Sequence, residues 1–381
     1  MKNICIITND DPLKQPRVLR QLKYFTSLNN QFCVYLISNS KVREYPVINY
    51  ELERFSILKN FIRIFLYIKT KNYENYFWTK KNKNLAKNLL KVKFDLIIVH
   101  GIRNILLGQK IARGAKILFD AHEYYPENFS DNFWWRFSFK DYYHYLCKKY
   151  LNKTDYVITV SQGILEEYKR NFNVKNIELI TNAKNYKDIE PSKVNESHIK
   201  LIHHGDCSSS RKLELMIEAA KYFNRNLHLH LMLVVSRGYE FYFKKLKRMA
   251  DKLENVHFIE PVPPDKIIDK INSFDIGLVF VPPTNINLKY GLGNKFFEYI
   301  QARLMLITGP SIEMVKYIDK YNLGKYTTSF EPKELAQLVN NLTANEIEEY
   351  KNNVNSCAFE LSDEQENYSK LDTIFRKLLN N

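Results

Sequence analysis

The sequence is poor in cysteine and has no long apolar run. Five cysteines are scattered over 381 residues, and no two of them form a CxxC pair. An odd, unpatterned set of this kind indicates reduced thiols in a cytoplasmic protein, and it argues against a disulfide framework or a cysteine zinc site. No apolar run approaches the ~20 residues that a membrane-spanning helix needs, so a transmembrane protein is not expected.

Several nucleotide-binding and catalytic motifs are also missing. No GxGxxG pattern follows the first strand-like run, Asn3–Thr8, and the chain has no P-loop, no GxSxG and no HExxH. A dinucleotide fingerprint, a P-loop site, a serine-hydrolase elbow and a zincin helix are therefore not expected. His203 and His204 are adjacent, but no second cluster of ligands accompanies them, so we predict no metal site.

What the sequence does contain is a series of short apolar runs separated by helix-length gaps. Apolar runs without alternation are typical of parallel strands buried on both faces, and the repeated strand–helix order predicts a doubly wound α/β fold. The runs are Asn3–Thr8, Phe32–Ser38, Phe94–His100, Lys116–Asp120, Asp155–Val160 and Ile177–Ile180, then Ile199–His203, Leu227–Val235, Val256–Ile259, Asp275–Phe280 and Leu304–Ile307.

The length of the chain favours two domains. The two series of runs are separated by a polar stretch that contains Pro191 and has no apolar periodicity, which is typical of a linker. We predict an N-terminal Rossmann-like domain over 1–183, a linker over 184–198 and a second Rossmann-like domain over 199–361. Two such domains facing each other place the carboxyl ends of both sheets at one cleft.

A candidate anion site follows the run Asp275–Phe280. Gly291, Gly293 and Asn294 stand where a loop should turn into a helix, and Lys295 and Glu298 follow. A helix N-terminus offers free N–H groups and partial positive charge, and glycines let a ligand approach the backbone. Lys295 would add a full charge, and Glu298 could accept hydrogen bonds from sugar hydroxyls. An ordinary capped core helix has the same pattern, so both interpretations stay open on these residues alone.

Polar residues follow two other predicted strands. His122 and Glu123 come directly after Lys116–Asp120, where a histidine is well placed for polar or proton contacts, although it could equally cap the next helix. Gly205, Arg211 and Lys212 follow Ile199–His203 in a small polar loop. Cations at a helix start are unfavourable for the helix dipole, so a role in binding phosphate is favoured over a merely solvated helix start. In the first loop, Arg17 could line the cleft.

The net charge of +15 is concentrated in one segment. Residues 54–93 contain eleven Lys or Arg and a single acid, Glu74. Within this segment, apolar residues recur at helical spacing between 56 and 70, and charged ones lie between them. This pattern predicts an amphipathic helix on an anionic membrane surface. The five residues predicted to contact the membrane are Lys59, Phe61, Arg63, Phe65 and Lys69.

The basic segment is also compatible with two further functions. Basic residues interleaved with aromatics suit single-stranded nucleic acid, and a helix packed on the core with a solvated basic side has the same composition. Because no nucleic-acid motif accompanies the segment, nucleic acid is not predicted as a partner.

Taken together, these segments resemble GT-B-fold glycosyltransferases, and among them the retaining, nucleotide-sugar-dependent family 4. The resemblance covers nearly the whole chain and rests on four segments in the family's order. These are Asp120-Ala121-His122-Glu123, Thr181-Asn182-Ala183, His204-Gly205 with Arg211, and Gly293-Asn294-Lys295 with Phe297-Glu298.

The resemblance implies transfer of a sugar from a nucleotide diphosphate to an acceptor hydroxyl with retention, without a metal or other cofactor. The donor would be a UDP- or GDP-sugar. His122 would contact the sugar, and Glu123 and Arg17 would lie on the acceptor side. The implied donor-binding residues are Gly205, Arg211, Lys212, Asn294, Lys295 and Glu298. A C-terminal helix at about 362–381 would cross back to the first domain.

The chain departs from the family pattern at several positions. Tyr290 stands where the family often has a second Glu, eight residues before Glu298, which leaves the identity of the sugar open. Thr181 and Ala183 replace the Pro and Gly of the family's turn. The family's Lys comes about five residues after the Arg, whereas Lys212 follows Arg211 directly.

The basic aromatic surface extends the expectation to the acceptor. We expect a glycan or lipid-linked acceptor in surface polysaccharide or glycolipid assembly, and a cytoplasmic protein peripheral to the inner face of the plasma membrane. Two alternatives keep the fold: a nucleotide-sugar epimerase, and a non-catalytic partner subunit, the latter suggested by Tyr290.

Overall fold

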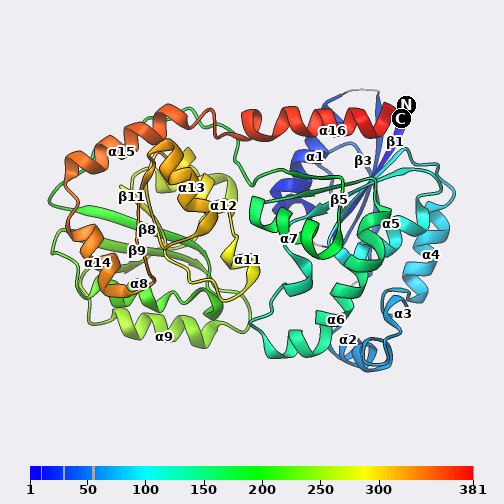
Figure 1. Cartoon of the computed structure of the whole chain (residues 1–381), viewed down its shortest axis with the longest axis horizontal. Helices are drawn as coiled ribbons and strands as arrows, with labels where there is room; N and C mark the ends of the chain where they lie inside the picture. Colours follow the sequence, from blue (N-terminus) through cyan, green and yellow to red (C-terminus); the bar gives the residue numbers. More distant parts are fainter. Residues whose placement is uncertain (10, 29–30, 54–55, 381) are drawn as a thin grey trace. The chain divides into compact units, whose positions relative to one another are not determined.

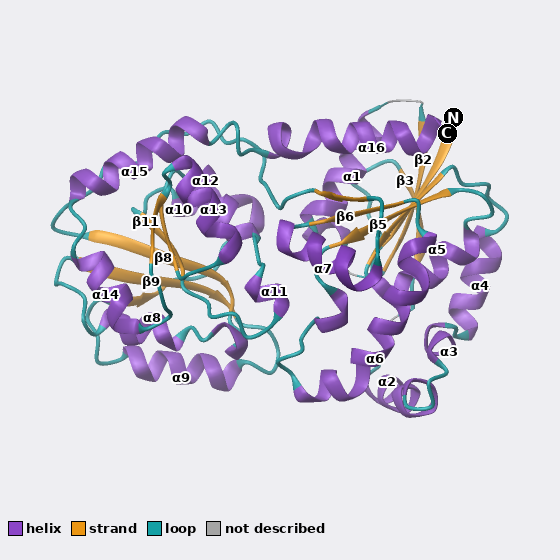
Figure 2. Cartoon of the chain, viewed as in Figure 1, coloured by secondary structure: helices purple, strands orange, loops and turns teal. Residues whose placement is uncertain are grey.

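The computed structural model describes residues 1–9, 11–28, 31–53 and 56–380 (Figures 1 and 2). The chain divides into two compact units, unit 1 comprising Met1–Ile180 with Lys370–Asn381, and unit 2 comprising Thr181–Ser369. The residues expected as a linker, 184–198, lie in unit 2. Arg54 and Phe55, at the start of the basic segment, and Asp10 of the first loop lie outside the described residues.

Unit 1 is built on a seven-stranded sheet in the order β3-β2-β1-β4-β5-β6-β7, and the neighbouring strands pair in parallel. Its strands are β1 (Lys2–Ile7), β2 (Phe32–Ser38), β3 (Val47–Glu51), β4 (Leu96–His100), β5 (Lys116–Ala121), β6 (Tyr156–Thr159) and β7 (Ile177–Leu179). Its helices are α1 (Pro16–Ser27), α2 (Ile57–Arg63), α3 (Tyr73–Phe77), α4 (Lys80–Leu89), α5 (Ile105–Ile111), α6 (Phe133–Tyr150), α7 (Gln162–Phe172) and α16 (Ser369–Asn380).

Helix α16 completes one face of this sheet, where it lies along α1 (Figure 1). The Tyr24 hydroxyl of α1 donates to Asp372 of α16 at 2.6 Å. The apolar side chains of α16 share a core with those of α1, β1 and β4, so the C-terminal helix is part of the hydrophobic core of unit 1. Its buried residues are Leu371, Ile374, Phe375 and Leu378.

Unit 2 repeats the architecture with six strands in the order β10-β9-β8-β11-β12-β13, whose paired neighbours are again parallel. Its strands are β8 (Ile199–Asp206), β9 (Leu227–Val234), β10 (Val256–Phe258), β11 (Ile276–Val279), β12 (Met305–Thr308) and β13 (Gly324–Tyr326). Its helices are α8 (Glu214–Ala220), α9 (Glu240–Ala250), α10 (Ile267–Ile271), α11 (Ile286–Lys289), α12 (Asn294–Gln301), α13 (Ile312–Tyr321), α14 (Pro332–Asn340) and α15 (Ala344–Cys357).

The predicted α/β class is therefore correct, and the differences lie at the edges. Strands β3 and β13, the outermost strands at one edge of each sheet, are not among the predicted runs. The β3 side chains are half-buried or exposed, and β13 has only three residues, so neither forms a buried apolar run. Strand β8 extends three residues beyond its predicted end, because it pairs with β9 as far as Asp206 opposite Val234.

Three histidines lie together where β9 and β10 pair. The His228 Nδ1 and His257 Nε2 atoms are 3.1 Å apart, and the rings of His230 and His257 are 4.7 Å apart. Burial lowers the pKa of all three imidazoles, to about 4 for His230, and the neighbouring histidines lower it further.

This cluster predicts loss of stability in mild acid. The unfolded chain binds protons at the ordinary histidine pKa of ~6.5, whereas the folded chain resists protonation, so stability should fall as the pH drops from ~6.5 towards 4. Thermal unfolding measured at pH 7.5 and pH 5 should give a lower Tm at pH 5, and His230→Gln should reduce that difference. The matched control is His144→Gln, which removes an exposed histidine. An equal pH dependence in the two variants would contradict the prediction.

Candidate functional site

The carboxyl edge of the unit 1 sheet is organised around Asp120 at the end of β5. Pro16 occupies the first turn of α1, and Arg17 and Gln21 follow on one face of that helix, four residues apart. The Arg17 Nε and Nη2 atoms lie 2.8 and 2.7 Å from Asp120 Oδ1, and Gln21 Nε2 donates to Oδ2 at 2.8 Å. Both carboxylate oxygens are thus held by α1.

A chain of hydrogen bonds leads from Asp120 to His122. Because the Gln21 amide nitrogen donates to Asp120, its oxygen accepts from His100 Nε2 at 2.8 Å. His100 is neutral, so its Nδ1 accepts from His122 Nε2, also at 2.8 Å. This order places a proton of His122 on Nε2, the ring nitrogen that faces His100. The His122 side chain is 26% exposed, so it is the one of these four residues that reaches solvent.

Burial and charge set the ionisation of these groups. Burial opposes the charge on Asp120, but the Arg17 guanidinium and the neighbouring His122 and His100 together outweigh burial and hold the pKa of this carboxyl below its usual range. Burial also lowers the pKa of His100 to about 3, which keeps this ring neutral. The buried Asp120 carboxylate therefore stays negatively charged, and hydrogen bonds through the neutral side chains of Gln21 and His100 connect it to His122.

His100, Asp120 and His122 also form the one group of potential metal ligands found among the described residues. Their ligand atoms already have partners, since Asp120 accepts from Arg17 and Gln21, and His100 accepts from His122. A cation would have to displace the Arg17 guanidinium, so these residues do not fit a metal as they stand.

The two residues assigned to the acceptor side lie in different environments. Arg17 is buried, and besides Asp120 it donates to the Ile180 carbonyl at 2.6 Å, so its position does not support contact with an acceptor. It positions Asp120 instead. Glu123 is half-buried next to His122, and its carbonyl accepts from the Tyr168 hydroxyl at 2.7 Å.

In unit 2, the carboxyl end of β8 holds Lys295 of α12. The His203 Nδ1 lies 2.8 Å from the Leu278 carbonyl, which can only accept, so Nδ1 carries the proton. Burial lowers the pKa of His203 and keeps its ring neutral, and Nε2 therefore accepts from the Lys295 ammonium at 3.1 Å. Burial, together with the charge of Arg211, also lowers the pKa of Lys295 well below its usual value.

Gly205 lies beside this lysine, and its backbone conformation favours glycine. Its φ of +122° is rarely adopted by other residues, and a Cβ here would lie 3.5 Å from the Lys295 Nζ. The sequence predicted that this glycine borders the binding loop, and the structure places it near the end of β8, directly beside Lys295.

Glu298 lies one turn further along α12 and is nearly buried. Its Oε1 pairs with the Lys184 ammonium at 3.0 Å, and its Oε2 lies 3.4 Å from His204 Nε2. Burial lowers the pKa of His204 to about 4, so its ring is a neutral neighbour of the carboxylate. Glu298 is thus fixed from both sides.

The other residues expected at this site are more exposed. Asn294 is the first residue of α12, and the Gly293 N-cap provides no side-chain cap for the helix start. Arg211 and Lys212 do not open a helix as predicted. Arg211 ends a 3₁₀ turn over Ser209–Arg211, and Lys212 takes a left-handed conformation before α8 begins. The Arg211 Nε lies 3.7 Å from Asp206 Oδ2.

The segment predicted to form an amphipathic helix is helical in the structure, as α2 followed by a π-helical turn over Ile64–Ile68. Phe61 and Phe65 are 55% and 49% exposed, and Lys59 is exposed. The other two cations serve the fold. Arg63 donates to the carbonyls of Asn75 and Tyr76, and the Lys69 ammonium lies 3.1 Å from the centre of the Phe137 ring and donates to the Phe137 carbonyl.

The exposed apolar surface is wider than predicted, because the start of α6 packs beside the π-helical turn (Figure 1). We call the following set the aromatic patch: Phe61, Ile62, Phe65, Leu66, Phe133, Trp134 and Phe137, each between 48% and 68% exposed. Within the described ranges, none of the helices has both the length and the hydropathy needed to traverse a bilayer.

Sequence reasoning missed Gln21, His100 and Lys184. Gln21 and Lys184 stand outside the predicted strand ends, in a helix and in the expected linker. His100 does end a predicted strand, and its position at a strand end was the signal that could have marked it as a candidate site residue.

A protein-family model matches the N-terminal part of the chain. Residues 18–185 match the model of Glycosyltransferase Family 4. No curated protein matches the chain in sequence.

Solved structures match the whole chain in fold. The HepE protein of Anabaena with UDP and glucose has a TM-score of 0.71 at 12% identity, covering 98% of this chain and 100% of that one. A glycosyltransferase of Rickettsia africae gives 0.71 at 16%, covering 100% and 99%. The sucrose-phosphate synthase of Thermosynechococcus elongatus gives 0.72 at 12%, covering 100% of both. The fold is GT-B, and the resemblance to GT-B glycosyltransferases of the family 4 type is confirmed.

The buried Arg17–Asp120 pair predicts a large stability difference. Asp120→Asn removes the charge that compensates a buried guanidinium, so unfolding in urea should show a loss of about 3 kcal/mol. The matched control is Glu51→Gln, which removes the acid of an exposed pair with Lys81 and should cost about 1 kcal/mol or less. Equal losses in the two variants would show that the buried pair contributes no more than the exposed one.

Proposed function

We propose that this chain is a retaining glycosyltransferase that moves a sugar from a UDP- or GDP-sugar to an acceptor hydroxyl without a metal. The observation that carries the proposal is the cationic end of β8 and α12, where Lys295, the uncapped helix start and Gly205 lie together beside Glu298. Such a site suits a diphosphate and an adjoining ribose.

The electrostatics of Lys295 support binding of an anion. Its lowered pKa reflects burial without a carboxylate in direct contact, and a diphosphate would supply the missing negative charge. Arg211 would bind the same group, and Lys212 and Asn294 would contribute at its edge. Glu298, held by Lys184 and His204, would accept from the ribose hydroxyls.

In the proposed reaction, the bond between the anomeric carbon and the diphosphate oxygen breaks, and the acceptor oxygen bonds to the same face of that carbon. The acceptor proton passes to the leaving diphosphate. Lys295, Arg211 and the start of α12 stabilise the charge on the leaving group. His122 contacts the donor sugar, and the fixed charge of Asp120 stabilises positive charge there through the relay.

A panel of nucleotide sugars tests the donor site. The purified protein should slowly hydrolyse one of them, with EDTA present, and Lys295→Met and Glu298→Gln should each slow this at least tenfold, because each removes a charge-assisted contact. Lys270→Met and Glu254→Gln change the same residue types at exposed positions of unit 2 and are the controls. Normal hydrolysis by both site variants would place the donor elsewhere.

The same assay separates the alternatives. Conversion of the nucleotide sugar without loss of the sugar would identify an epimerase. Donor binding without turnover, with full pathway function of a His122→Ala/Glu298→Ala variant, would identify a non-catalytic subunit. With an acceptor, the anomeric configuration of the product, read by NMR, tests retention.

We further propose that the acceptor is a glycan or lipid-linked glycan of surface polysaccharide or glycolipid assembly, and that the protein works as a peripheral protein on the inner face of the plasma membrane. The aromatic patch, with the exposed Lys59 and the basic segment around it, supports this assignment. Large exposed apolar side chains flanked by cations favour an anionic bilayer surface. In the HepE structure the bound molecules are UDP and glucose, which supports the donor class.

Vesicle co-sedimentation tests the membrane assignment. The protein should bind vesicles of phosphatidylglycerol and phosphatidylcholine more than pure phosphatidylcholine, and Phe65→Ser/Trp134→Ser should weaken binding at least tenfold, since two large apolar side chains no longer enter the bilayer. Phe241→Ser/Phe359→Ser, at exposed positions of unit 2, is the control. Equal binding by the two double variants would remove the aromatic patch from the membrane contact.

A further inference from the structure

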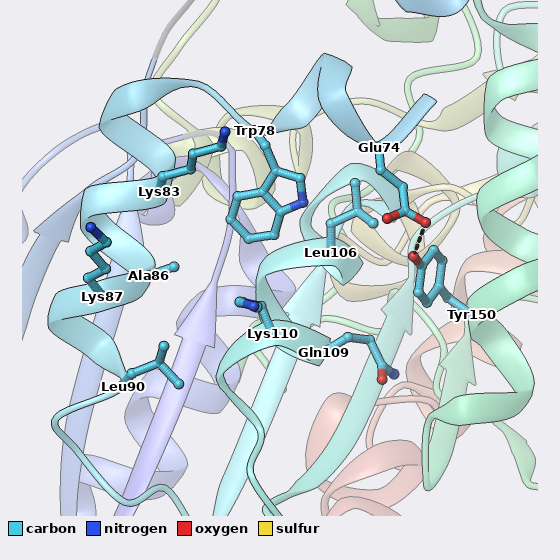
Figure 3. Close-up of a pocket in the computed structure, with 10 residues that line it drawn as sticks. All are labelled: Glu74, Trp78, Lys83, Ala86, Lys87, Leu90, Leu106, Gln109, Lys110 and Tyr150. Atoms are coloured by element: carbon cyan, nitrogen blue, oxygen red, sulfur yellow. Dashed lines mark hydrogen bonds between the residues drawn. The ribbon is translucent and has the colours of Figure 1, made fainter. Parts of the chain in front are cut away.

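Unit 1 contains a pocket of about 520 Å³ between α3, α4, α5 and the end of α6 (Figure 3). This volume suits a small ligand. The Trp78 indole stands in its middle, between side chains of α4 and α5 (Figure 3). Its apolar lining is completed by Ala86, Leu90 and Leu106.

Three lysines border this apolar surface. Lys83 and Lys87 come from α4, and Lys110 comes from α5. Among the residues that the structure describes, none of the three ammonium groups has a hydrogen bond, salt bridge or ring contact. Three exposed ammonium groups without a partner in the described protein, gathered around one indole, favour an anionic ligand that also has an apolar part.

The single carboxylate of the pocket does not balance these charges. Glu74 accepts from the Tyr150 hydroxyl at 2.6 Å and from the Tyr145 hydroxyl at 3.1 Å, and it pairs with Lys149. The Lys149 and tyrosine hydrogen bonds lower the pKa of Glu74, so the group is a fixed part of the wall between α3 and α6.

The pocket adjoins the aromatic patch through α3. Arg63, beside Phe61 and Phe65, donates to the carbonyls of Asn75 and Tyr76, the two residues that follow Glu74. The Tyr76 ring also packs on Phe139 of α6. Only the short helix α3 therefore separates the pocket from the aromatic patch. A lipid headgroup at a membrane surface that contacts the patch would lie close to the pocket.

We propose that this pocket binds the phosphate headgroup of an anionic lipid. Lys83, Lys87 and Lys110 surround the phosphate, and the first carbons of the lipid pack on Trp78, Leu90 and Leu106. The site is separate from the donor site of unit 2, and its binding is measured without any sugar donor, so it stands or falls independently of glycosyl transfer.

Tryptophan fluorescence tests the site directly, because the chain has three tryptophans and two of them, Trp134 and Trp135, can be replaced by Phe. In that background, dihexanoyl phosphatidic acid, kept below its micelle concentration, should change Trp78 emission saturably. Lys83→Gln/Lys87→Gln/Lys110→Gln should weaken binding roughly a hundredfold, given the contribution of one surface cation to lipid binding.

The matched control is Lys80→Gln/Lys91→Gln/Lys93→Gln, which removes the same charge from exposed lysines in and just beyond α4 and should bind as the parent does. Dihexanoyl phosphatidylcholine and inorganic phosphate should bind at least tenfold more weakly, because each lacks one of the two required parts. Equal affinity of the two triple variants would overturn the proposal. Inorganic phosphate or uridine monophosphate binding as tightly as the lipid would overturn it in favour of a soluble anion.

Discussion

The buried ion pair between Arg17 and Asp120 is the interaction on which unit 1 depends most. It joins the first helix to the middle of the sheet, and the same guanidinium holds the carbonyl of Ile180, the last residue of the unit before the chain enters unit 2. A buried guanidinium and a buried carboxylate are each costly alone, so each requires the other. Their pairing leaves Asp120 ionised. This fixed negative charge is the start of the hydrogen-bond chain that runs through Gln21 and His100 to His122.

Unit 2 also contains buried charged side chains, but there the charge that lacks an ionic partner is positive. Its buried carboxylate, Glu298, is held between Lys184 and His204, while Lys295 rests against a neutral imidazole. The Glu298 carboxylate of α12 thus has its partners within the protein, whereas the Lys295 ammonium of the same helix has no carboxylate in direct contact. That imbalance favours binding of an anion over closer packing of the helix.

The sequence predicted the parts of the structure whose signal is local. Buried parallel strands are runs of apolar residues, so β1, β4, β5, β8 and β11 were found, whereas the edge strands β3 and β13 present mixed or very short sequences. Gly205, Lys295 and Glu298 were predicted as site residues because they follow strands or begin a helix. The placement of Arg17 was wrong and Lys184 was missed, because each owes its role to a partner more than 100 residues away. Arg63 and Lys69 were assigned to the membrane from the helical spacing of apolar and basic residues, but hydrogen bonds to backbone carbonyls decide their positions.

Helix α16 gives the chain an order of assembly. During synthesis, residues 1–180 leave the ribosome first, yet their core lacks Leu371, Ile374 and Phe375 until the last helix is made. Unit 2, by contrast, is contiguous from Thr181 to Ser369 and has its whole core before α16 emerges. The core of unit 2 is therefore formed by one continuous stretch of sequence, whereas the core of unit 1 is completed only by residues that follow unit 2 in the sequence.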